Sequence, residues 1–186
     1  MLRRTLLRHN VPGGSSTGVH YDRLFLRGGD AFFLTAWVPI GDVSHRGGGL
    51  YYLEDSVRLG EALEADFSAR AGAAGFSEQE KVSAFNANMS AVGYLSDNNE
   101  DFPVEHAKVC AAEGRDPKQF RWLVADFEAG DVVFHDPCIL HGSLGNDDEQ
   151  GRIRLSTDLR FYEKKAFDEG RADNRWMRRW TATDSL

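Results

Sequence analysis

The stretch Ile153–Tyr162, which reads IRLSTDLRFY, alternates between two kinds of side chain along its whole length. Side chains two residues apart on a strand point to the same face, so this pattern predicts a β-strand with two chemically distinct faces. The members of one face are mostly apolar, namely Ile153, Leu155, Thr157, Leu159 and Phe161. The other face is polar and charged, with Arg154, Ser156, Asp158 and Arg160.

Further runs rich in β-branched and aromatic residues extend this interpretation to the rest of the chain. They are Ala31–Val38, Gly49–Leu53, Arg121–Phe127 and Val132–Phe134, and Gly-rich or polar turns separate them. Because strands lie on both sides of a helical segment, we expect a mainly β fold, an antiparallel barrel or jelly roll with a helical excursion from one rim.

The middle third has helical character. Ser56–Arg70 and Ser77–Ala91 carry apolar residues at spacings of three and four, and a third short helix is expected near Val104–Glu113. Ser77 and Glu80 match a capping box, which marks a helix start. We therefore expect a single domain over residues 1–186, with a helical insert at about 56–113 and a C-terminal tail at about 163–186.

Composition restricts the class of protein. The 186 residues are 41% hydrophobic and carry a formal charge of −7, which is typical of one soluble globular domain and argues against a nucleic-acid partner. No apolar run is long enough for a membrane span. Two distant cysteines fit neither a zinc finger nor a disulfide framework, so a cytoplasmic location is expected. Organelle targeting remains an alternative, because three arginines and no acidic residue precede Asp22; the simpler interpretation is a first strand.

The histidines are the first candidates for chemistry. In His20-Tyr21-Asp22, an imidazole and a carboxylate would share one face of a strand, and His141 ends an apolar stretch just before a Gly-rich turn. Two histidines and one carboxylate form the facial triad of non-haem Fe(II) oxygenases. The alternative is that these are ordinary core or surface histidines, and His135 is a competing ligand six residues before His141.

An arginine near this triad would bind a carboxylate. Arg152 follows His141 by eleven residues, and a hairpin would return it to the same end of the barrel. Its planar guanidinium can hold a dicarboxylate co-substrate that chelates the metal. The alternative is a solvated arginine at the edge of a strand.

These motifs occur together in an order that resembles the phytanoyl-CoA dioxygenase family of Fe(II)- and 2-oxoglutarate-dependent oxygenases, over about residues 8 to 162. The segments that carry the resemblance are His20-Tyr21-Asp22, Thr35–Asp42, Gly48-Gly49-Leu50, Gly130–His135 and His141–Asn146 continuing through Arg152 to Ser156. The resemblance implies a double-stranded β-helix, which is a cupin-like jelly-roll barrel. It also implies iron bound by His20, Asp22 and His141, and Arg152 on the distal carboxylate of 2-oxoglutarate. It also implies that Ser143 and Trp37 lie beside the co-substrate. No further catalytic residue is expected.

The implied reaction is the oxidation, by hydroxylation, of a small organic substrate, with O2 consumed and succinate and CO2 released. Only 19 residues precede His20, fewer than family members usually have, so we expect a shortened relative, a fragment or a late gene start. Apolar surface left open in this way could be covered by the second subunit of a homodimer. Two other functions stay open: a non-catalytic binding module that keeps the metal motif, and a cupin-type metalloenzyme independent of 2-oxoglutarate.

Overall fold

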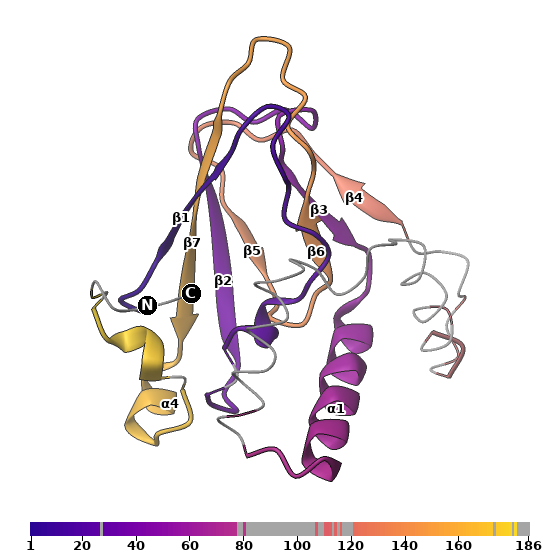
Figure 1. Cartoon of the computed structure of the whole chain (residues 1–186), viewed down its shortest axis with the longest axis vertical. Coiled ribbons are helices and arrows are strands. Elements are labelled where there is room, and N and C mark those ends of the chain that lie inside the picture. Colours follow the sequence, from indigo (N-terminus) through magenta and orange to yellow (C-terminus); the bar gives the residue numbers. More distant parts are fainter. Residues whose placement is uncertain are drawn as a thin grey trace.

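A computed structural model describes residues 1–26, 28–77, 80, 107, 110–112, 114, 116, 121–172, 174–179 and 181. Within these residues most of the regular structure is β, arranged in two antiparallel sheets (Figure 1). The larger sheet has the order β1-β7-β2-β5, with bounds Leu6–Asn10, Arg154–Tyr162, Phe33–Ile40 and Val133–His135. The smaller sheet has the order β4-β3-β6, with bounds Trp122–Val124, Leu50–Leu53 and His141–Ser143.

The strand order brings distant parts of the chain together. β7 pairs with β2 along the full length of β2, from Phe33 opposite Tyr162 to Ile40 opposite Leu155. On its other side β7 pairs with β1, so the arginine-rich start of the chain forms a strand, as the simpler interpretation predicted. The mainly β jelly roll expected from the alternating pattern is confirmed.

In β7 the polar face is buried and the apolar face is partly exposed, which is the reverse of an ordinary amphipathic strand. Arg154, Ser156, Asp158 and Arg160 are buried, whereas Leu155 and Phe161 are exposed by 38% and 37%. The polar face of the strand therefore lines the interior between the two sheets. Burial of charged groups is costly unless they are paired or bind a ligand, so this interior is a candidate site.

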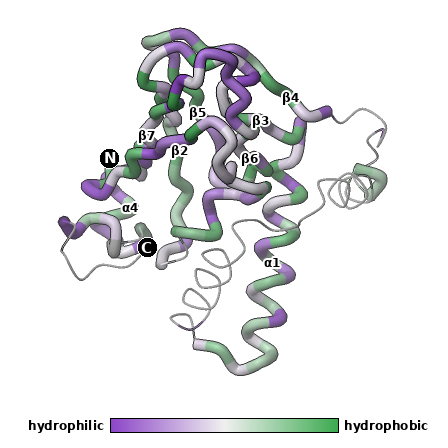
Figure 2. The backbone as a smooth tube through the Cα atoms, turned by 45° about the horizontal axis from the view of Figure 1, so that its top comes forward, coloured by the Kyte–Doolittle hydropathy of each residue, from purple (hydrophilic) through white to green (hydrophobic). Residues whose placement is uncertain are grey.

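The helix α1 (Val57–Ala73) follows β3 and extends away from the end of the smaller sheet (Figure 1). Leu59, Leu63 and Phe67, spaced by four residues, contact the core cluster that includes Tyr51 and Leu53 of β3. The turn before β6 approaches α1 at Gly60, where an added Cβ would lie 1.8 Å from the carbonyl oxygen of Cys138. Figure 2 shows both hydrophobic and hydrophilic residues along α1.

Most of the predicted elements are found with small shifts in their ends. The capping box is confirmed, since the Ser77 hydroxyl donates to Glu80 at 2.6 Å and the Glu80 amide donates to the Ser77 hydroxyl at 3.3 Å. The rest of the helix predicted at 77–91, and most of the one near 104–113, lie outside the described residues.

After β7 the described chain forms two short helices, α4 (Lys164–Asp168) and the 3-10 helix η3 (Asn174–Met177). Ala166 of α4 is buried against Phe33 and Tyr162, in a second core cluster at the end of the larger sheet. No helix within the described residues is both long enough and apolar enough to span a membrane.

Candidate metal centre

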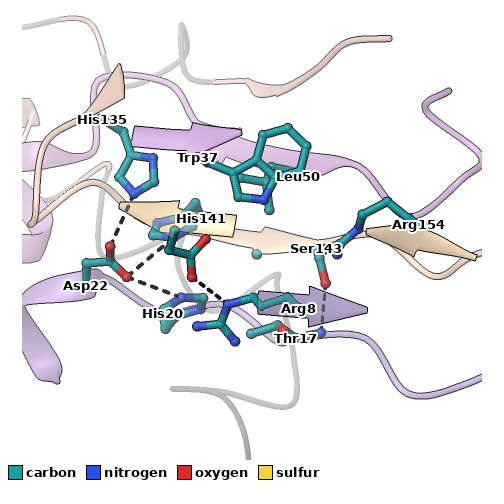
Figure 3. A pocket seen from close by; sticks show the side chains of 12 residues that line it. Arg8, Thr17, His20, Asp22, Trp37, Leu50, His135, His141, Ser143 and Arg154 are labelled. Carbon is teal, nitrogen blue, oxygen red and sulfur yellow. Dashed lines mark hydrogen bonds and ion pairs between the residues drawn. The ribbon is translucent and has the colours of Figure 1, made fainter. Parts of the chain in front are cut away.

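His20, Asp22 and His141 converge in the interior, and all three are buried (Figure 3). The backbones of His20 and His141 form a reciprocal pair of hydrogen bonds, with N–O distances of 2.8 and 2.9 Å. His20 forms only this single bridge, and the chain then turns into the 3-10 helix η1 (Asp22–Leu24). The side chains of His20 and Asp22 therefore converge through a turn, whereas the sequence argument had assumed a regular strand.

The ligating atoms face a common point. The Nε2 atoms of His20 and His141 lie 3.9 and 4.0 Å from Oδ1 of Asp22. One donor atom from each of the three residues lies within 4.8 Å of the other two. Two imidazole nitrogens and one carboxylate oxygen in such proximity fit one octahedral Fe(II), with room for further ligands.

Backbone carbonyl groups determine which ring nitrogen of each histidine is available. Nδ1 of His20 lies 2.9 Å from the carbonyl oxygen of Gly18, and Nδ1 of His141 lies 3.0 Å from that of Ile139. A carbonyl oxygen can only accept, so in both rings Nδ1 carries the proton. Each Nε2 is left with its lone pair directed toward Asp22, as metal ligation requires.

The second carboxylate oxygen of Asp22 is held by the protein. Oδ2 accepts hydrogen bonds from Thr35 Oγ1 at 2.6 Å, from Arg160 Nη2 at 3.1 Å and from His135 Nε2 at 3.4 Å. With Oδ2 occupied, Oδ1 is the atom presented to the two histidines. The carboxylate is thus oriented as a one-oxygen ligand before any ion arrives.

The electrostatics of the three residues favour the metal-binding protonation states. Burial lowers the pKa of His20 and holds that of His141 well below its usual value, so both rings are neutral. Burial by itself would raise the pKa of Asp22, but the charge of Arg160 and the hydrogen bond from His135 hold it well below its usual range. The three side chains are therefore two neutral imidazoles and one carboxylate.

His135, the competing ligand considered from the sequence, has a different environment. It is buried beside Asp22, and its Nδ1 lies 3.0 Å from the hydroxyl of Tyr52. If the hydroxyl donates to Nδ1, then Nε2 carries a proton and donates to Asp22. Both ring nitrogens then have a hydrogen-bond partner, so His135 supports the carboxylate ligand. It is not part of the group whose donor atoms converge.

The pocket around the cluster contains two of the predicted co-substrate residues. Its wall includes Trp37 and Ser143, together with Arg154 of β7 (Figure 3). Trp37 is 1% exposed, and its Nε1 has no hydrogen-bond partner within the described residues. Arg154 lies with its guanidinium carbon 5.9 Å from the centre of the Trp37 ring system. An unpartnered indole donor and a buried cation therefore border the same space.

Arg152 does not reach this pocket. Its side chain is 59% exposed and bonds the carboxylate of Asp148, with Nη2 to Oδ2 at 2.7 Å. The strand β7 begins at Arg154, so Arg152 is not part of it. Arg152 belongs to the preceding turn, where its backbone amide also donates to Asp148. The structure thus brings Arg154, and not Arg152, to the candidate metal centre.

Comparison with known protein families agrees with this geometry. Residues 2–154 match the family model described as phytanoyl-CoA dioxygenase. The chain belongs to the phytanoyl-CoA dioxygenase family. The match includes all three residues of the candidate metal centre and ends at Arg154.

Solved structures with a similar fold are distant in sequence from this phytanoyl-CoA dioxygenase family member. The non-haem α-ketoglutarate-dependent epimerase SnoN from nogalamycin biosynthesis superposes with a TM-score of 0.52 at 16% identity, covering 87% of this chain and 48% of its own. EvdO2 from Micromonospora carbonacea var. aurantiaca, complexed with 2-oxoglutarate, gives a TM-score of 0.44 at 14% identity, covering 94% and 58%. No curated protein matches. The chain spans about half the length of SnoN and of similar solved structures. The similarity to SnoN shows the fold alone.

Several residues of the site were not identified from the sequence. Thr35, Tyr52 and Arg160 surround the metal ligands. Thr35 begins one of the segments that carry the family resemblance, but the sequence assigned no role to any of the three. The available signal was the polar face of the strand predicted at Ile153–Tyr162. Charged groups at every second position of a strand in the middle of a sheet indicate a functional interior.

Proposed function

We propose that the chain is a non-haem Fe(II)- and 2-oxoglutarate-dependent dioxygenase that hydroxylates a small organic substrate and releases succinate and CO2. The observation that carries this proposal is the convergence of two histidine Nε2 atoms and one aspartate Oδ1 next to a buried arginine. Family membership supports the same chemistry. The three ligands leave positions on an octahedral ion for exogenous molecules.

In this proposal His20, Asp22 and His141 hold the iron. When bound, Fe(II) together with 2-oxoglutarate supplies the activation of O2 and the oxidation of a substrate C–H bond. Thr35, Arg160 and His135 keep Asp22 Oδ2 occupied, so that the carboxylate ligates through Oδ1. The carbonyl groups of Gly18 and Ile139 hold the two imidazoles in the ligating tautomer.

Arg154 is our candidate for the distal carboxylate of 2-oxoglutarate, in place of Arg152. Its Nε donates to the carbonyl of Gly48 and its Nη1 to the hydroxyl of Ser156, so within the described residues it hydrogen-bonds no carboxylate. Burial lowers the pKa of Arg154, a sign that its charge lacks solvation. A buried cation of this kind favours an anionic ligand. The eleven-residue spacing that selects Arg152 keeps that residue as the rival prediction.

Trp37 and Ser143 have supporting roles in this proposal. The free Nε1 of Trp37 is a donor suited to a carboxylate or keto oxygen. The hydroxyl of Ser143 accepts from the Thr17 amide at 2.8 Å and lines the same wall. Trp37 packs edge-on against Phe127, with 4.9 Å between the ring centroids. This contact keeps bulk water from that side of the pocket.

The test is succinate release from 2-oxoglutarate, with Fe(II) and a panel of small metabolites. We expect release that depends on iron and is abolished in Asp22→Ala, while the exposed control His45→Ala behaves as the wild type. No succinate under any condition, despite stoichiometric iron, would favour the binding module. Substrate turnover without 2-oxoglutarate would favour the cupin-type enzyme.

Location and assembly complete the proposal. We infer a cytoplasmic enzyme, supported by two cysteines that lie far apart in the sequence and fit no disulfide framework. We also infer a homodimer, because the outer face of the larger sheet exposes large apolar side chains. Leu7 is 70% exposed and Phe134 is 58% exposed, which leaves apolar area that a second subunit would cover.

A further inference from the structure

Four buried or half-buried charges form an alternating row through the interior. Arg8 Nε donates to Asp158 Oδ2 at 2.6 Å, and the same oxygen lies 4.0 Å from Arg160 Nη2. Arg160 Nη2 in turn lies 3.1 Å from Oδ2 of the metal-ligating Asp22. The row thus runs from β1 to the metal centre, and Asp158 is shared between two arginines.

The row and Arg154 together leave an excess of positive charge. Three guanidinium groups, of Arg8, Arg154 and Arg160, face two carboxylates, of Asp22 and Asp158. The charges of Fe(II) and of the 2-oxoglutarate dianion cancel, so one positive charge remains when both are bound. In a partly desolvated interior, an unbalanced cation favours an anionic partner.

The geometry of Arg8 indicates where that partner would bind. The Arg8 side chain is 35% exposed, and only its Nε is engaged; its two terminal amino groups have no hydrogen-bond partner within the described residues. In Figure 3 the guanidinium group of Arg8 lies between His20 and Thr17, at the wall of the metal pocket.

A larger chamber adjoins Arg8 on the outer side. Its volume is about 230 Å³, against about 30 Å³ for the space at the metal ligands, so the outer chamber has the room that an organic substrate needs. The two spaces share Arg8, Thr17, Ser143 and Arg154. Asn10 also lines the outer chamber, and its buried Oδ1 has no partner among the described residues.

We propose that Arg8 is a specificity-determining residue that binds an anionic group, a carboxylate or a phosphate, of the primary substrate. This inference rests on the proposed function, because it assigns Arg154 to 2-oxoglutarate and leaves Arg8 for the substrate. Arg160 cannot serve, since it is 2% exposed and lies against Asp22. A guanidinium with two free amino groups offers a carboxylate or phosphate a forked pair of hydrogen bonds.

The test measures the binding of simple anions by calorimetry to the Fe(II)-loaded protein under argon, with and without saturating 2-oxoglutarate. The probes are acetate and methyl phosphate, with acetamide as the neutral match for acetate. The variants are Arg8→Gln, which keeps a donor for Asp158, Arg8→Lys, and the control Arg58→Gln, an exposed arginine of α1. Thermal unfolding of each variant establishes that it is folded.

With 2-oxoglutarate bound, we expect wild-type protein and Arg58→Gln to bind at least one anion and to ignore acetamide. Arg8→Gln should bind that anion about tenfold or more weakly, with Arg8→Lys between the two. The preferred probe distinguishes a carboxylate substrate from a phosphate substrate. Should Arg8→Gln fail to fold, a several-fold loss in Arg8→Lys carries the same conclusion.

Equal anion affinity in wild type and both Arg8 variants would overturn the proposal. So would a loss of 2-oxoglutarate affinity in Arg8→Gln as large as that in Arg154→Leu, because Arg8 would then serve the co-substrate. Failure of the proposed function gives a different pattern: the wild type would not bind 2-oxoglutarate, yet its anion binding would still depend on Arg8.

Discussion

The two faces of the four-stranded sheet differ in a way that reverses the usual rule for amphipathic strands. Toward the interior, β7 presents Arg154, Asp158 and Arg160, whereas its outer face exposes Leu155 and Phe161. A polar interior is maintained only if its charges are paired or bind a ligand, and an apolar exterior is stable only if it is covered or tolerated. The inner face of the sheet therefore determines which ligands can bind, and the outer face determines what can pack against the sheet.

The largest effect on the inner face is expected from the metal ligands. The double variant His20→Ala/His141→Ala should lose Fe(II) binding altogether, because one carboxylate remains. His135→Ala should keep the site but weaken it by roughly 10- to 100-fold, as expected for a residue that orients a ligand. Metal content after dialysis measures both. Full iron occupancy in the double variant would rule out the assigned ligand set.

Removal of Arg160, the arginine between Asp22 and Asp158, should have a large effect on stability. Arg160→Met leaves Asp22 and Asp158 without their shared partner, so the metal-free protein should lose about 3–5 kcal/mol of unfolding free energy. The matched control Arg171→Leu removes an exposed pair with Glu169 and should cost about 1 kcal/mol or less. Urea unfolding compares them. Equal losses would show that the buried row is not electrostatically important.

The next largest effect is expected on 2-oxoglutarate binding, when the neighbouring residues Arg154 and Arg152 are compared. Arg154→Leu should weaken 2-oxoglutarate binding to the iron-loaded protein by about 10- to 100-fold, since a hydrogen bond to a charged group contributes about 1.5–3 kcal/mol. Arg152→Leu should change little, because Asp148 is the one partner that this side chain bonds among the described residues. Calorimetric titration of both variants decides between them. The reverse order would restore the eleven-residue spacing rule.

The outer face should give the smallest effect, on association alone. If a second subunit covers the sheet, Phe134→Asp should shift sedimentation toward the monomer, while the fold and metal binding persist. Val124→Asp, at an exposed position on the smaller sheet, serves as the control. A wild-type protein that remains monomeric at high concentration would remove the homodimer from the account.

How far the sequence predicts this molecule depends on the element. The alternating pattern located β7, and a long run rich in β-branched and aromatic residues located β2. β6 has three residues with the sequence HGS and carries neither signal. His20, Asp22 and His141 were identified because the motif and the family resemblance point to the same residues. Periodicity showed that β7 has two faces but could not say which is buried, because burial follows from the charges that meet across the barrel.

The residue spacing and the structure favour different arginines, Arg152 and Arg154, for a related reason. The spacing after His141 counts residues through a turn, and only the structure shows that the strand begins at Arg154. Arg8 was beyond reach from the sequence, because its partner Asp158 is 150 residues away. Side chains that meet only through the sheet register have no local signal.

The most direct test of the central claim, that the polar inner face of the sheet is a metal and co-substrate site, is a crystal structure with Mn(II) and 2-oxoglutarate grown without O2. We expect one metal ion ligated by His20 Nε2, Asp22 Oδ1 and His141 Nε2, with the distal carboxylate of 2-oxoglutarate against Arg154. A metal ion bound elsewhere, or a co-substrate carboxylate held by Arg152 outside the pocket, would contradict the account.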